Sequence, residues 1–71
     1  MKTYKEKEQT SFRLDLLKET IEELVFANGL IESPEVLVYY ACLNEGYMMD
    51  KLPPVEVLVL KNHAENCLSQ V

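Results

Sequence analysis

The fold is decided by the stretch Asn28-Gly-Leu-Ile-Glu-Ser-Pro34, which separates two segments of helical periodicity. Asn followed by Gly supplies backbone positions with positive φ, on which helices end. Ser before Pro is an N-cap residue followed by a residue already held at helical φ. The stretch therefore predicts a helix before it, a short loop, and a second helix that begins at Pro34.

The segment from Ser11 to Asn28 has apolar residues at intervals of three and four, and charged residues occupy most of the remaining positions. This spacing predicts an amphipathic helix with Thr10 or Ser11 as its N-cap. Its apolar positions are Leu14, Leu17, Ile21, Leu24 and Val25. Residues 1–10 carry no such period, so we expect a flexible amino-terminal arm before a single helical domain over residues 11–71.

The second expected helix runs from Pro34 to about Met49 and is apolar almost all round. One broad face carries Val36, Leu37, Tyr40, Leu43, Tyr47 and Met48. The opposite side is apolar as well, because Val38, Tyr39 and Ala41 lie on it. A helix of this kind is buried on more than one side, which requires a third helix or a partner.

A third segment begins after the pair Pro53-Pro54 and keeps the helical spacing to the end of the chain. Its apolar positions are Val57, Leu60, Ala64, Cys67, Leu68 and Val71. Residues 55–60 are rich enough in β-branched side chains to form a strand instead, and this alternative stays open. The continuing period favours a helix. The expected fold class is all-α, an antiparallel helical hairpin plus a third helix in a small bundle.

Length and charge exclude several classes of function. The chain has 71 residues, with 7 Lys plus Arg against 12 Asp plus Glu, giving a net charge of −5. One domain fits this length, and the acidic balance argues against binding of nucleic acid. The longest apolar run, residues 36–43, is far shorter than the ~20 residues that span a bilayer. We therefore expect no membrane segment and a cytoplasmic location.

The cysteines and acidic residues each allow a chemical interpretation. His63 and Cys67 are spaced i, i+4, and Cys42 offers a third ligand, but zinc would lack a fourth. We predict free, inert cysteines with no metal and no cofactor. A group of carboxylates flanks the central loop and forms either a solvated face or a patch for a basic partner. Its members are Glu19, Glu22, Glu23, Glu32 and Glu35.

The hairpin sequence suggests a family. Ile-Glu-Glu-Leu at residues 21–24, Asn-Gly-Leu at 28–30 and Ser-Pro-Glu-Val-Leu at 33–37 resemble the small aspartyl-phosphate phosphatases that act on the sporulation response regulator of endospore-forming bacteria. The family has two antiparallel helices, and its second helix carries a Ser-Gln-Glu-Leu-Asp motif. In register from Ser33, the motif falls on residues 40–44, Tyr-Ala-Cys-Leu-Asn, where only Leu43 matches. The resemblance implies that the docking hairpin is retained without the catalytic residues.

We therefore predict a small regulatory protein that binds another protein, with a response regulator as the class implied by the resemblance. The expected binding residues are Tyr39, Tyr40, Asn44, Glu45 and Tyr47. The excess of apolar surface also predicts a homodimer built on the second and third helices. Its expected interface residues are Val38, Tyr39, Leu58 and Val59. Two alternatives stay open, a phosphatase with a diverged motif and a structural homo-oligomeric subunit.

Overall fold

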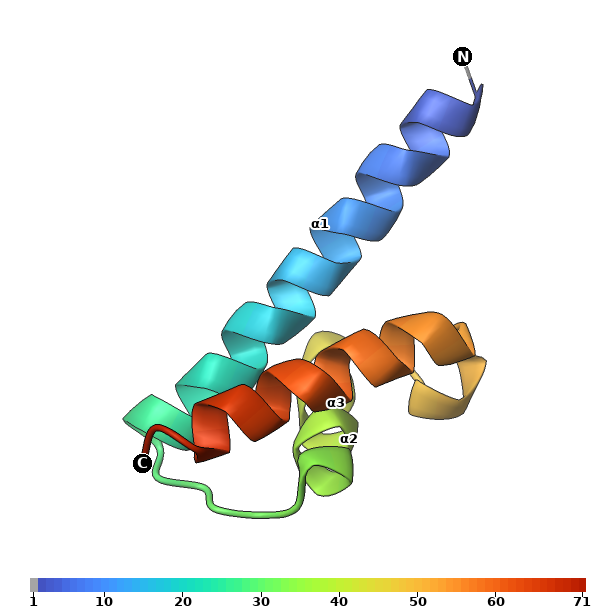
Figure 1. The fold of residues 1–71 in the computed structure, drawn as a ribbon. Coiled ribbons are helices and arrows are strands. Elements are labelled where there is room, and N and C mark those ends of the chain that lie inside the picture. The colour runs from blue at the N-terminus through green and yellow to red at the C-terminus, as the bar shows by residue number, and fades with distance from the viewer. Residues whose placement is uncertain (1) are drawn as a thin grey trace.

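Helices account for most of the chain in the computed structural model, which describes the backbone of residues 2–71 and the side chains of residues 12–71 (Figure 1). The elements in order are α1 (Lys2–Glu22), the π-helical turn η1 (Glu23–Ala27), α2 (Pro34–Glu45), the 3₁₀ turn η2 (Met49–Lys51) and α3 (Pro54–Leu68). No strand occurs in the described backbone, and residues 55–60 are helical. The predicted all-α bundle is confirmed.

Helix α1 begins at Lys2, so the predicted cap at Thr10 or Ser11 is wrong. Residues 2–9 are mostly Lys, Glu and Gln, which have high intrinsic helix propensity and prolong the helix without an apolar stripe. The amino-terminal half of α1 extends beyond α2 and α3 (Figure 1). The flexibility of residues 1–10 stays a prediction, and Met1 lies outside the described residues.

The carboxyl end of α1 widens into η1 before the chain turns. The amide of Asn28 donates to the carbonyl of Glu23 at 3.1 Å, five residues back, which is the π-helical pattern. Gly29 then adopts φ +67° and ends the helix, and the amide of Leu30 returns to the carbonyl of Leu24 at 2.9 Å. The Asn-Gly pair thus ends the first helix as predicted.

Helix α2 begins as predicted and ends four residues early. The Ser33 hydroxyl accepts a hydrogen bond from the amide of Val36 at 3.4 Å, and Pro34 is the first helical residue. The predicted extension to Met49 is wrong, because Gly46 turns left-handed at φ +80°. The amide of Tyr47 then donates to the carbonyl of Cys42 at 2.8 Å, which completes a Schellman motif.

The core lies where α2 packs against both α1 and α3. Its buried apolar residues are Leu17, Ile21, Val25, Leu37, Val38, Ala41, Cys42, Leu52, Leu60, Ala64 and Cys67. The stripes predicted for α1 and α3 face this core, except that Val71 is exposed and lies beyond the end of α3 at Leu68. The stripe predicted for α2 was placed wrongly, because Tyr40 and Leu43 are exposed while Val38 and Ala41 are buried.

An ion pair joins α1 to the first turn of α3. Arg13 Nε donates to Glu56 Oε1 at 3.0 Å, and Arg13 Nη2 donates to Glu56 Oε2 at 2.7 Å. The Glu56 side chain is 8% exposed and the Arg13 side chain 27% exposed. The hydrogen-bonded carboxylate raises the pKa of the Arg13 guanidinium. Bidentate geometry of this kind orients two helices as well as attracting them.

Replacing Gly46 by alanine should lower the free energy of unfolding by about 1–2 kcal/mol, because an alanine in the left-handed region places Cβ too close to a carbonyl oxygen. Nothing else lies within 4 Å of an added Cβ, so backbone conformation alone sets the cost. Urea unfolding followed by circular dichroism measures it. The Gly46→Asn variant is the control and should lose less stability, because asparagine tolerates this conformation.

The Arg13→Met variant should lose about 2 kcal/mol of stability, because it leaves a buried carboxylate without its charged partner. The double variant Arg13→Met/Glu56→Leu should recover much of that loss, since both charges are then removed. Urea denaturation of the wild-type, single and double variants gives the coupling energy. A double variant less stable than Arg13→Met would contradict this account of the pair.

Candidate functional site

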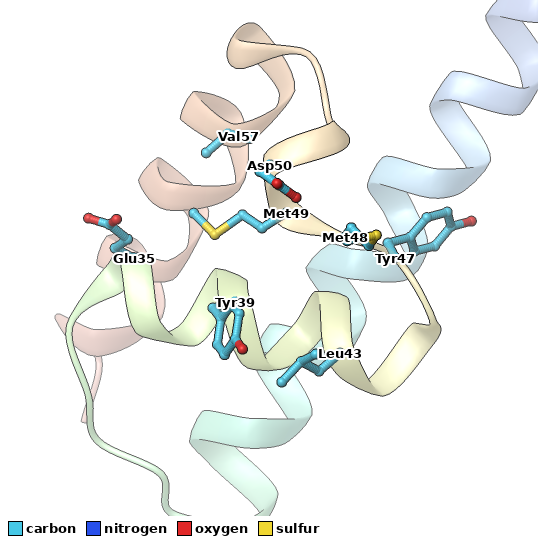
Figure 2. A pocket seen from close by; sticks show the side chains of 8 residues that line it. All are labelled: Glu35, Tyr39, Leu43, Tyr47, Met48, Met49, Asp50 and Val57. Atoms are coloured by element: carbon cyan, nitrogen blue, oxygen red, sulfur yellow. The ribbon is translucent and has the colours of Figure 1, made fainter.

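An open apolar groove of about 540 Å³ lies between α2, η2 and α3 (Figure 2). It is lined by Glu35, Tyr39, Leu43, Tyr47, Met48, Met49, Asp50 and Val57. Met49 and Val57 are half-buried and pack against the core, so they form the floor. Tyr47 is half-buried as well, but its ring points away from the other lining side chains, toward α1 (Figure 2). The other five side chains are exposed and form the walls and rim. This set of residues is referred to below as the apolar groove.

The groove follows from the helix spacing of α2 and from the stop at Gly46. Glu35, Tyr39 and Leu43 are spaced i, i+4, i+8, so they form one outward row along α2. Because the chain leaves the helix at Gly46, the following residues cross toward α3 instead of continuing along α2. Figure 2 shows the Met49 side chain reaching between α2 and α3.

Three large apolar side chains of the groove are exposed to solvent. Tyr39 is 49% exposed, Leu43 56% and Met48 60%. Each large apolar side chain left in water forgoes about 1.5–3 kcal/mol of burial free energy. Adjoining side chains of this kind mark an interaction surface more often than scattered ones do. Methionine adds adaptability, because its unbranched thioether fits irregular partner surfaces.

The charged side chains of the groove are all acidic. Glu35 lies at one end of the outward row on α2, and Asp50 lies on η2 (Figure 2). Among the described side chains that line the groove, none is Lys or Arg. The rim therefore favours a positively charged contact over a negative one.

Two of the five predicted binding residues line the groove and three do not. Tyr39 and Tyr47 belong to it. Tyr40 is exposed next to it, with its ring centroid 5.9 Å from that of Tyr39. Asn44 is exposed, and Glu45 faces α1 instead, where Thr20 Oγ1 lies 2.9 Å from its Oε2. The other six residues that line the groove were not predicted as binding residues: Glu35, Leu43, Met48, Met49, Asp50 and Val57. Gly46 as a helix stop is the signal that would have found Met49 and Asp50.

The predicted dimer interface is wrong at Val38, which is fully buried between the helices. Tyr39 and Leu58 are exposed as expected, and Val59 is half-buried. The prediction failed at Val38 because α2 packs against both α1 and α3. A helix with two neighbours buries a face that is wider than a single stripe. Self-association itself stays a prediction.

A second hollow, of about 510 Å³, lies on the side of α1 that faces Glu45. It gathers three of the predicted carboxylates, Glu19, Glu22 and Glu23, while Glu32 and Glu35 are not part of it. The remaining lining residues are Leu16, Thr20, Phe26, Ala27 and Glu45. Glu22 also contacts α3, since its Oε2 lies 2.9 Å from His63 Nε2. This surface is acidic and more open to solvent than the apolar groove.

Cys42 and Cys67 are both free and buried in the core. Burial raises the pKa of each thiol, and the Glu22 carboxylate adds to the effect at Cys67. No group of three His, Cys, Asp or Glu side chains with metal-binding proximity occurs among the described residues. The nucleophilic form of cysteine is the thiolate, and a raised pKa favours the protonated thiol instead. Neither cysteine is therefore placed to act as an activated nucleophile.

Both thiols should resist a thiol reagent in the folded protein at neutral pH, because a raised pKa leaves less thiolate and burial blocks access. Ellman's reagent added to folded and urea-unfolded protein provides the test. The reaction in native buffer should follow the rate of unfolding and become fast only in urea. Rapid modification of one native thiol would show that its burial is breached by local opening.

Two of the five positions that correspond to the phosphatase motif are buried, and the other three, Tyr40, Leu43 and Asn44, are exposed. Ala41 and Cys42, where the family has glutamine and glutamate, are buried in the core. Orienting water for attack on an acyl phosphate needs a polar side chain that reaches solvent. The nearest carboxylate, Glu45, is next to the Thr20 hydroxyl.

Comparison of the chain with family models, with curated proteins and with solved structures finds no match. Within the described part of the chain, the helices are too short or too polar to cross a lipid bilayer.

Proposed function

We propose that this chain is a small regulatory binding protein whose apolar groove holds a segment of another protein. The support is one observation: Tyr39, Leu43 and Met48 stand half-exposed above a floor that is continuous with the core. A bound apolar segment recovers the burial free energy that these side chains lack in the free protein.

The dimensions of the groove favour a short segment over a whole domain surface. A volume of about 540 Å³ accommodates a few side chains. A standard interface between two globular proteins uses about 20–30 residues on each partner, whereas eight residues line the groove. Docking of one peptide segment is typical of reversible, regulatory contacts.

The resemblance of the hairpin to sporulation phosphatases makes a response regulator one partner to test. The proposal requires no phosphatase activity, since Ala41 and Cys42 are buried at the motif positions. A cytoplasmic location is part of the same proposal.

Photo-crosslinking in the organism that encodes the chain tests the proposal. A benzophenone amino acid replaces Leu43 in one variant and Leu58 in a matched control. The two leucines are 56% and 57% exposed, and only Leu43 lines the groove. We expect a discrete adduct with another protein from position 43. Position 58 belongs to the predicted dimer interface, so the one adduct that it can give is with a second copy of this chain.

The captured protein is then purified and its affinity for the chain measured by titration calorimetry. Leu43→Asp should weaken binding at least tenfold, about 1.4 kcal/mol, because it places a charge in an apolar contact. Leu58→Asp should change it little. Equal adducts from both positions, or no adduct from either, would refute the groove as the binding site.

A further inference from the structure

We infer that the segment held by the apolar groove is a basic amphipathic helix, an inference that rests on the proposed function. The groove combines an apolar floor and walls with acidic groups at its rim. The complementary ligand carries apolar side chains on one face and Lys or Arg beside them.

The charges of the groove and of the whole chain favour a cationic ligand. Glu35 and Asp50 are the two ionised groups of the groove, and the whole chain carries a net charge of −5. The electrostatic field of the whole chain and the charges at the rim of the groove are therefore both negative. Both attract a cationic segment and slow the approach of an anionic one.

The same charges disfavour a second copy of the chain as the occupant. A two-fold interface brings the same surface of each subunit together. Glu35 and Asp50 would then meet an equally acidic rim, between two chains of charge −5. Like charges brought together at an interface weaken the association.

The shape of the groove favours a helical ligand. The outward row Glu35, Tyr39 and Leu43 spans nine residues of α2, and the eight steps of 1.5 Å between its ends make about 12 Å. A partner helix presents apolar side chains at i, i+3, i+4 and i+7, which fits a row of this length beside α2. Docking of an extended strand needs a free sheet edge, and residues 2–71 contain no strand. The two methionines can adjust to the partner side chains.

Three fluorescent peptides of about 18 residues test the inference, a length at which helix formation becomes practical. The first has leucines at helical spacing flanked by lysines. The second replaces each lysine by glutamate, and the third has the composition of the first with its leucines scattered around the helix. Fluorescence anisotropy measures binding of each peptide to the full chain. The lysine peptide should bind at least tenfold more tightly than either control, and its affinity should fall as salt rises from about 0.1 to 1 M.

Variants of the chain locate the binding. Leu43→Asp should weaken binding of the lysine peptide at least tenfold, while the matched Leu58→Asp should leave it within about twofold. The Glu35→Lys/Asp50→Lys variant should lose affinity for the lysine peptide and gain affinity for the glutamate peptide. Circular dichroism checks that each variant is folded. Met48→Ser, at an exposed position outside the helices, replaces Leu43→Asp if that variant unfolds.

Equal binding of the lysine and glutamate peptides, or no binding of the lysine peptide, would overturn the basic helix as ligand. If the crosslink from position 43 to another protein persists in that case, the proposed function stands and only this inference fails. If the crosslink is also absent, both fail. A wild-type dimer in sedimentation equilibrium that Leu43→Asp converts to a monomer would assign the groove to a second copy and overturn the inference.

Discussion

The position of α2 between two neighbouring helices is the constraint on which the rest of the structure depends. Its buried residues are Leu37, Val38, Ala41 and Cys42. They are two adjacent pairs one turn apart, so the buried face is wider than a single stripe. Of the other apolar residues of α2, Val36 is half-buried, and Tyr39, Tyr40 and Leu43 must then face outward. The exposed apolar surface is therefore a consequence of how the helix is buried.

The lining of the groove also depends on the residue at which α2 ends. At Gly46 the backbone turns left-handed, and Tyr47 and Met49 pack back on the core instead of extending the helix. This return brings α3 alongside α2 and leaves Met48 and Asp50 at the edge. A single backbone conformation therefore connects the packing of the bundle to the lining of its groove.

Polar contacts set how the helices lie against one another. Arg13 and Glu56 join α1 to α3 at one end, and Glu22 and His63 join the same helices farther along. Thr20 contacts Glu45 of α2. Burial of apolar surface has no direction, so these paired groups supply the orientation that it lacks. None of these three pairs lines the apolar groove.

The sequence by itself determined the helix limits at Gly29, Ser33 and Pro54, because caps and stops depend on neighbouring residues only. The core stripes of α1 and α3 were equally predictable, since each helix buries one face. Tertiary structure alone decided which residues of α2 face outward, because nearly all its positions are apolar and the pattern has no polar side. It also decided that Glu56 meets Arg13 and that Val57 shares a groove with Tyr39, since these residues lie on different helices and local spacing carries no information about such contacts.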